Sequence, residues 1–404
     1  MLILRRCLST AMPSTSTKVA DKTVKVATKE SGEKRSALGW TRFMERMYEN
    51  HTDKLASLNR KLEDLDAERV RTLDELERRS QFVQFLEKAV INETKCRFVP
   101  VGSTVTGLTT SSSDFDYVLF IRDKDRRDEF FSLTNNADHK KSFMKKLRLL
   151  IARHAQEMEN PITETFSLTQ VRVPLLMMKF RDGTSLDVTL PDPTYHAVRN
   201  TNLVRCYVQA DPRFARLFGW LKNMANAMGI RNSKQGLLSS YHLLTLLIHF
   251  LQSEQCLSPW TVLPVLSKTH PFLVSPDIPI DKVIDSLLNP TPPFIKGWSS
   301  NNTMDCAELW LRFVDFYDKF DVAKHAIYLS NGIAPRRNQF TDDVKLQIYD
   351  PYSNATICRS VNAQRAFKLG IAFLKKNMED GFFIDTFPEP PEVEDLKRQI
   401  LGYS

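Results

Sequence analysis

The sequence lacks several features that would place it in a special class of protein. Its six cysteines are scattered and form no Cys-x-x-Cys pair, so we expect no zinc finger or zinc knuckle, and reduced thiols are the default. No apolar run approaches about 18 residues, so we expect no membrane-spanning helix. RNP and KH motifs are also missing. An ordinary globular protein remains.

The charge balance is only modestly basic, with 56 Lys and Arg against 48 Asp and Glu and a net charge of +8. That excess suits a protein that holds a polyanion loosely, although many proteins without nucleic-acid partners share it.

The N-terminus is basic and poor in acids. Residues 1–20 contain Arg5, Arg6 and Lys18 but no Asp or Glu, and Ser and Thr are dense after Ser9. This composition is typical of a mitochondrial presequence. A disordered tail is the alternative interpretation, so we expect a mitochondrial location, with the cytoplasm as the alternative.

A helical pattern follows the N-terminal segment. Leucines from Leu55 to Leu76 recur at spacings of 3, 4 and 5 residues, mostly separated by charged residues. A short coiled coil is one interpretation, but the heptad slips near Arg69. We favour helices that pack back on the fold.

An α/β pattern occupies the next part of the chain. Tyr117 to Ile121 is a short buried strand, and Lys140 to His154 is an amphipathic helix. Two further strands, Val171 to Phe180 and Thr184 to Leu190, meet at Asp182-Gly183, which is a strong hairpin signal.

Beyond residue 200 the pattern is mostly helical, and the acidic, proline-containing tail after Pro388 is expected to be loose. We predict an α+β protein with a mixed sheet followed by a helical domain. The predicted divisions are a presequence or disordered segment (1–37), helices (38–80), an α/β domain (81–200), a helical domain (201–385) and a tail (386–404).

Three carboxylates fit a metal-dependent phosphoryl transfer. Residues i and i+2 of a strand share one face, so Asp114 and Asp116 point the same way as the Tyr117 strand begins. Asp187 alternates with Leu186 and Val188 on the hairpin's second strand, which predicts that it faces away from the core. Two divalent cations require such converging carboxylates.

A Gly-Ser pair precedes these carboxylates by ten residues. Gly102 lets backbone N–H groups approach phosphate oxygens, and Ser103 adds a hydroxyl donor. Taken singly, each motif is usually a loop, a capping arrangement or an exposed strand residue. In this order they predict a phosphate and metal site.

The run PVGSTVTGLTTSSSDFDYVLF (100–120), with Asp187, resembles the DNA-polymerase-beta-like nucleotidyltransferase superfamily. The resemblance implies a nucleotidyltransferase palm that binds two Mg²⁺ or Mn²⁺ ions through Asp114, Asp116 and Asp187. It also implies phosphate contacts from Gly102 and Ser103. Asp187 would take the proton from an RNA 3′-hydroxyl.

The later motifs resemble cytoplasmic and mitochondrial poly(A) and poly(U) polymerases, including their poly(A)-polymerase-associated region at about residues 305–361. These motifs are NTNLVR (200–205), WLK (220–222), GLLSSY (236–241), LWLRFVDFYDKFD (309–321) and IYDPY (348–352). The resemblance implies adenylate addition from ATP to RNA 3′ ends without a template. The implied nucleotide contacts are Asn200 and Thr201 to the ribose, Lys222 and Ser240 to phosphates, Tyr241 stacking on the base and Asp350 near its edge.

Two departures from the family pattern matter. Relatives often have a second lysine four residues after the first, where this chain has Asn226, so one triphosphate contact is weaker or supplied elsewhere. Uracil-preferring members often place a histidine shortly after the Asp-Pro-Tyr motif. Residues 353–356 contain none, which favours ATP over UTP.

The alternatives are a terminal uridylyltransferase, an inactive RNA- or protein-binding scaffold, and an enzyme that transfers nucleotides to a small molecule or protein. The template-like motifs of CCA-adding enzymes are missing. Since no RNA-binding module is recognisable, we expect help from an RNA-binding partner protein or a homodimer, the latter through residues 40–80.

Overall fold

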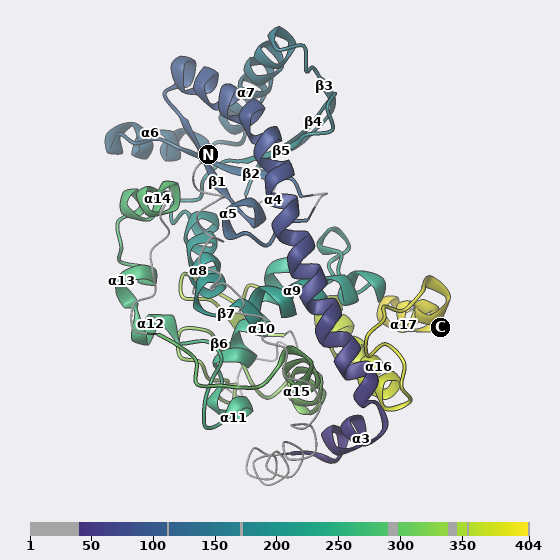
Figure 1. The fold of residues 1–404 in the computed structure, drawn as a ribbon. Helices are drawn as coiled ribbons and strands as arrows, with labels where there is room; N and C mark the ends of the chain where they lie inside the picture. Colours follow the sequence, from purple (N-terminus) through teal and green to yellow (C-terminus); the bar gives the residue numbers. More distant parts are fainter. Residues whose placement is uncertain are drawn as a thin grey trace, which may run out of the picture. The chain divides into compact units, whose positions relative to one another are not determined.

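The computed structural model describes residues 40–110, 113–169, 173–289, 298–337, 346–353 and 355–402, and Figure 1 traces their elements. The predicted presequence lies outside these residues. The chain divides into two compact units. The palm unit comprises Glu68–Gln209 and Phe272–Phe294, and the central unit comprises the described residues of Ala11–Ala67, Ala210–Pro271 and Ile295–Ser404. The first palm segment thus begins at Glu68 and ends at Gln209, whereas the predicted boundaries lie between residues 80 and 81 and between residues 200 and 201.

The palm unit is built on a mixed five-stranded sheet with the order β1-β2-β5-β4-β3. Strands β2 and β5 are parallel, and the other neighbours are antiparallel. The strands are β1 (Arg97–Val101), β2 (Phe115–Phe120), β3 (Ile162–Leu168), β4 (Leu175–Phe180) and β5 (Ser185–Thr189). The predicted α+β fold with a mixed sheet is confirmed.

Alternating residues of β2 enter two separate cores. Tyr117 and Leu119 pack with the residues of α4 (Thr52–Thr94) after Glu68 and with α7 (Ala137–Glu157). Val118 and Phe120 pack instead with α8 (His196–Ala210) and α14 (Ile280–Leu288). The sheet therefore has helices on both faces, and residue parity decides which face a side chain meets.

The predicted hairpin connects β4 and β5. Phe180 N–H donates to Thr184 O at 2.9 Å, and Gly183 adopts φ +83° at the turn. Asp182 Oδ1 accepts Thr184 N–H at 2.9 Å. The turn fixes which residues of β4 and β5 lie opposite each other.

Short helices complete the palm unit: α5 (Ser103–Thr106), α6 (Lys124–Thr134) and α13 (Pro271–Val274), which begins at the unit boundary. The lysines at 141, 145 and 146 are exposed on α7, as expected for a solvated helix face.

The central unit is mostly helical, as predicted. Its longer helices are α3 (Arg42–Asn50), the start of α4, α9 (Pro212–Ala227), α10 (Ser240–Gln252), α15 (Cys306–Lys319), α16 (Val361–Glu379) and α17 (Glu394–Leu401). Shorter elements are η1 (Ser233–Gln235), α11 (Glu254–Leu257), α12 (Leu266–Thr269) and η2 (Pro390–Val393). The short strands β6 (Ile327–Tyr328) and β7 (Ile348–Tyr349) pair in parallel.

Two expectations about the ends of this unit are settled by burial. The leucines at 55, 58 and 62 of α4 are buried inside the chain, so this part of the apolar stripe packs back on the fold. The prediction of a loose tail is wrong, because Val393, Leu396 and Ile400 are buried and α17 packs on α16.

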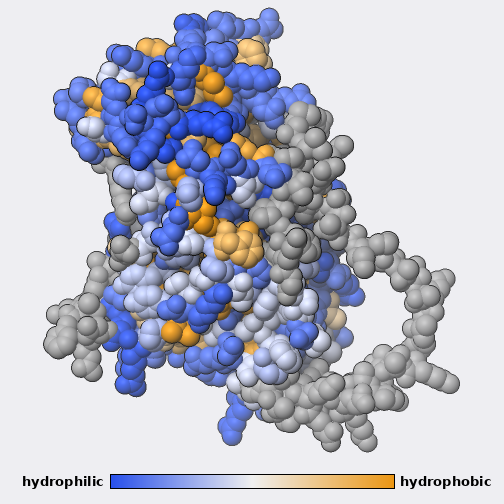
Figure 2. All heavy atoms as spheres, turned by 90° about the vertical axis from the view of Figure 1, so that its left-hand side faces the viewer, coloured by the Kyte–Doolittle hydropathy of each residue, from blue (hydrophilic) through white to orange (hydrophobic). Residues whose placement is uncertain are grey.

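The last feature of the fold is how apolar its helices and its surface are. Among the described residues, no helix is both long and apolar enough to cross a membrane. Figure 2 shows a face on which hydrophilic residues predominate and hydrophobic ones are scattered.

Candidate active site

Asp116 and Asp187 are brought together by strand pairing. Asp116 on β2 is the register partner of Asp187 on the parallel strand β5. Both have the parity opposite to the residues that enter the α4–α7 core, so their side chains share the other face of the sheet. Asp114 is exposed and directly precedes β2. The structure therefore pairs Asp116 with Asp187. The third predicted carboxylate, Asp114, lies two residues before Asp116 in the sequence.

Gly102 lies directly against Asp116. It adopts φ +74°, and a Cβ there would stand 2.5 Å from Asp116 Oδ2. It also precedes the short helix α5, which begins at Ser103. Only a residue without a side chain fits this backbone and this contact. The predicted phosphate loop thus passes beside the carboxylates.

Thr201 on α8 fixes this loop. Its Oγ accepts Gly102 N–H at 3.0 Å and donates to Ala197 O at 2.7 Å. The hydroxyl has a single proton, so only an acceptor position remains for the predicted ribose contact. The neighbouring Asn200 has a buried Oδ1 without a hydrogen-bond partner among the described residues, which leaves an acceptor suited to a sugar hydroxyl.

The carboxylates repel one another. Burial, and secondly the charges of Asp187 and Asp114, raise the pKa of Asp116 to about 7. Burial and nearby like charges both disfavour the ionised form of a carboxyl group, and a bound divalent cation would favour it again. Among the described residues no three carboxylate, imidazole or thiolate groups already form a metal-binding cluster.

A second group lies within the central unit. It comprises Lys222 on α9, Ser240 at the start of α10, and Arg231, which sequence reasoning missed. Arg231 Nε donates to Ser240 Oγ at 3.0 Å. Burial, and secondly the charge of Arg231, lowers the pKa of Lys222. This group is cationic and suited to phosphate.

Tyr241 and Asp350 are also brought together in the central unit. Tyr241 donates its hydroxyl proton to Asp350 Oδ2 at 3.2 Å, and Tyr352 N–H donates to Asp350 Oδ1 at 2.9 Å. Asp350 is 4 % exposed. Its carboxylate therefore holds the Tyr241 ring in place, while its predicted contact with a base edge stays a prediction.

His242 fastens this region. Its Nδ1 accepts Ser239 N–H at 3.2 Å in a capping box, so Nε2 carries the proton that it donates to Ile357 O at 3.1 Å. Burial lowers its pKa, which keeps the ring neutral. These contacts give His242 a structural role in joining the start of α10 to the Ile357 backbone.

Comparisons with known proteins agree with this geometry. Residues 58–209 match the family model for the central palm domain of mitochondrial-like poly(A) RNA polymerase. The match covers Glu68–Gln209 of the palm unit, which is therefore similar to the palm domain of these polymerases.

Relatives and solved structures extend the likeness beyond the palm. Human poly(A) RNA polymerase GLD2 is 27% identical over 282 residues, which cover 68% of this chain and 53% of the relative. The chain thus spans about half the length of this relative. The structure of the GLD-2/RNP-8 complex matches with a TM-score of 0.64 at 21% identity, covering 83% of this chain and 99% of that one.

A structure of the Cid1 poly(U) polymerase, bound to 3′-dATP, has a TM-score of 0.55 at 19% identity over 77% of this chain and 91% of that one. These structural matches show the fold.

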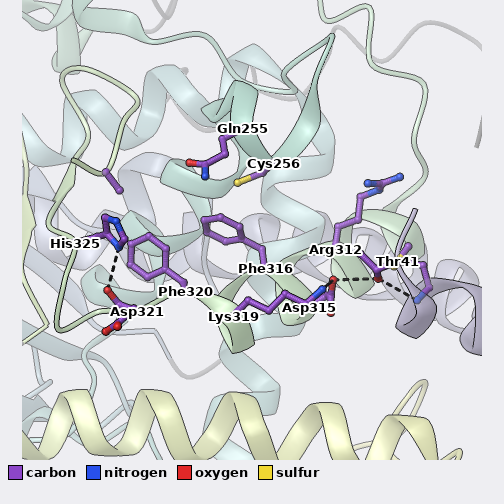
Figure 3. Close-up of a pocket in the computed structure, with 12 residues that line it drawn as sticks. Thr41, Gln255, Cys256, Arg312, Asp315, Phe316, Lys319, Phe320, Asp321 and His325 are labelled. Carbon is purple, nitrogen blue, oxygen red and sulfur yellow. Dashed lines mark hydrogen bonds and ion pairs between the residues drawn. The ribbon is translucent and has the colours of Figure 1, made fainter. Parts of the chain in front are cut away.

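A separate pocket of the central unit contrasts with the candidate site residues. Its volume is about 390 Å³, and it is lined by residues of α15 and its neighbours (Figure 3). Lys319 is 2.7 Å from Asp315 Oδ2, and Arg312 Nε donates to Glu308 at 3.0 Å. Its charges are thus neutralised internally, and no predicted site residue lines it.

Proposed function

We propose that this chain adds adenylates from ATP to the 3′ end of RNA without a template. The observation that carries the proposal is the in-register pair Asp116 and Asp187 beside the Gly102 loop. The cationic group around Lys222 supports it, because a nucleoside triphosphate needs both a cation site and phosphate donors. The names of the relatives, poly(A) RNA polymerases, point the same way.

The proposed reaction is a displacement at the α-phosphorus of ATP. The RNA 3′-oxygen forms a bond to that phosphorus, the bond to the bridging oxygen of the β-phosphate breaks, and pyrophosphate leaves. Asp187 accepts the hydroxyl proton. Asp114, Asp116 and Asp187 would hold two Mg²⁺ or Mn²⁺ ions, which when bound neutralise phosphate charge and favour the ionised hydroxyl.

In the same proposal each remaining residue binds or orients the nucleotide. Gly102 and Ser103 contact phosphate oxygens, and Asn200 with Thr201 meets the ribose. Lys222 and Ser240 bind the triphosphate. Tyr241, oriented by Asp350, stacks on the base.

The test is primer extension with the full chain. Labelled RNA is incubated with Mg²⁺ or Mn²⁺ and one of the four nucleoside triphosphates at a time, and products are resolved by length. We expect 3′ extension with ATP above the other three. The double variant Asp114→Ala, Asp116→Ala should give none, and full activity in that variant would contradict the carboxylate assignment.

Uridylate addition is the second candidate, because the Cid1 poly(U) polymerase shares the fold. The absence of a histidine at residues 353–356 favours ATP, and a preference for UTP in the same assay would replace the first proposal. RNA binding without extension by any nucleotide would favour a scaffold.

We also propose that an RNA-binding partner protein presents the RNA. The GLD-2 structure is a complex with RNP-8, and three leucines of the candidate dimer segment, at 55, 58 and 62, are buried inside this chain. A mitochondrial location is proposed from residues 1–37. A fluorescent protein fused to that segment should accumulate in mitochondria, whereas cytosolic fluorescence would contradict it.

A further inference from the structure

Arg231 occupies the place beside Asn226 where a positive charge is missing from α9. Asn226 is exposed and lies one helical turn after Lys222, so both side chains start from the same face of α9. Arg231 Nη1 donates to Asn226 Oδ1 at 2.8 Å. A guanidinium is therefore fixed on the surface patch that a side chain at 226 would cover.

The backbone before Arg231 is anchored. Ile230 is buried, and its O accepts Leu238 N–H at 3.2 Å. It packs against Gly370 of α16, where an added Cβ would stand 2.8 Å from Ile230 Cδ1. Because the preceding residue is held on two sides, the starting point of the Arg231 side chain is fixed.

Two cations are kept close together here without an acidic partner. The charge of Arg231 contributes to lowering the pKa of Lys222, so the two side chains interact. Ion pairs within the described part of the chain involve neither residue. Placing like charges together is unfavourable, and a polyanionic ligand would remove that cost.

The hydrogen-bond donors around Arg231 suit phosphate oxygens. Its bonds to Asn226 and Ser240 use two N–H groups of the five that a guanidinium carries. Ser240 Oγ accepts from Arg231 and so keeps its own proton for donation to an anion. Lys222 adds an ammonium, and the group offers three kinds of donor to one ligand.

We infer that Arg231 is a triphosphate-binding residue of this chain and supplies the second cation that α9 lacks at position 226. This inference rests on the proposed function for the identity of the ligand, a nucleoside triphosphate. Arg231 acts by binding the β- and γ-phosphates, and Asn226 and Ser240 act by orienting its guanidinium.

The test compares ATP with AMP, which lacks the β- and γ-phosphates. Equilibrium titration of the full chain would give both dissociation constants for wild type and Arg231→Gln. We expect the ATP constant to rise about tenfold or more, as for loss of a charge-assisted hydrogen bond, with a much smaller change for AMP. Equal changes for both nucleotides, or none, would overturn the inference.

Two variants separate binding from a structural role. Lys234→Gln removes an equal charge from the exposed 3₁₀ helix η1 of the same loop and should leave ATP binding unchanged. Asn226→Lys added to Arg231→Gln restores a cation one turn after Lys222 and should recover most of the ATP affinity. If the double variant unfolds at the same temperature as wild type but does not recover ATP affinity, the positive charge of Arg231 is not what binds ATP.

The binding and extension assays fail independently. A chain that binds ATP more tightly than AMP through Arg231 but extends no RNA would refute the proposed function and keep the inference. A chain that extends RNA equally well with Arg231→Gln, at ATP concentrations below the wild-type KM, would refute the inference alone.

Discussion

The palm and central units each gather like charges, but of opposite sign. In the palm, Asp116 is paired with Asp187, and its pKa is raised to about 7. In the central unit, Lys222 lies near Arg231, and its pKa is lowered. The pocket beside α15 differs from both, because Lys319 and Asp315 neutralise each other there. Like charges gathered in two places mark candidate binding groups for a cation and for an anion.

The comparison predicts that the acidic group affects catalysis and the basic group affects binding. Asp116→Asn should have the largest effect on activity. It should lower kcat in primer extension about a thousandfold or more, because a charged metal ligand is lost. Asp182→Asn changes an exposed hairpin carboxylate and should retain activity. If Asp116→Asn raised the KM for ATP and left kcat unchanged, the acidic group would affect binding and not catalysis.

Gly102→Ala tests how tightly the loop and the carboxylate are matched. The added methyl group would meet Asp116 Oδ2 at 2.5 Å on a backbone with φ +74°. We expect about a hundredfold loss of kcat/KM, for displacement of a catalytic group, and destabilisation by about 1–2 kcal/mol.

Gly183→Ala is the matched control for that variant. Its φ is +83° but nothing lies within 4 Å of an added Cβ, so it shares the backbone strain and lacks the collision. Primer extension and urea unfolding of both variants separate the two effects. Equal activity losses in the two variants would show that strain alone matters.

Tyr241 should distinguish stacking from hydrogen bonding in the central unit. Tyr241→Ala removes the ring and should raise the ATP KM about tenfold, as for loss of base stacking. Tyr241→Phe keeps the ring but loses the bond to Asp350 at 3.2 Å, and about a threefold rise is expected. If Phe were as damaging as Ala, orientation by Asp350 would matter more than stacking.

The smallest expected effect is on stability against pH without metal. Since the pKa of Asp116 is raised from 3.8 to about 7, the unfolded state loses its proton first as pH rises between these values. The free energy of unfolding of wild type should therefore fall by about 1–3 kcal/mol over that range. Asp116→Asn should lack this decrease.

Urea unfolding in EDTA at several pH values measures this difference. Below pH 4 the two proteins should differ least, because Asp116 is then protonated in both states of the wild type. Parallel stability curves for the two proteins across the whole range would contradict the raised pKa of Asp116.

The site was predictable where the sequence carries a short-range pattern. The alternation around Asp187 and the Asp-Gly turn predicted the hairpin and the face of the carboxylate. Strand β3 was missed, because its residues are mostly exposed and their burial does not alternate. The docking of α14 onto the palm sheet was also missed, since no local pattern reports a contact between residues so far apart in the chain.

The cation at Arg231 belongs to the same class of omission. It lies five residues after Asn226, beyond a helix end, and reaches back only because Ile230 is anchored. Helix spacing predicts neighbours at i+3 and i+4, and it carries no information about a loop. Thr201 was assigned to the ribose, but its bond to Gly102 depends on a contact between α8 and the loop before α5.

The pairing of Asp116 with Asp187 also limits how the chain length can change. Surface turns generally accept insertions and deletions, and the turn at Asp182-Gly183 is exposed. One residue lost or gained between Phe180 and Leu186 would shift β5 by one position and carry Asp187 to the opposite face of the sheet. Leu186 or Val188 would then stand opposite Asp116. This turn should therefore tolerate many substitutions but almost no change in length.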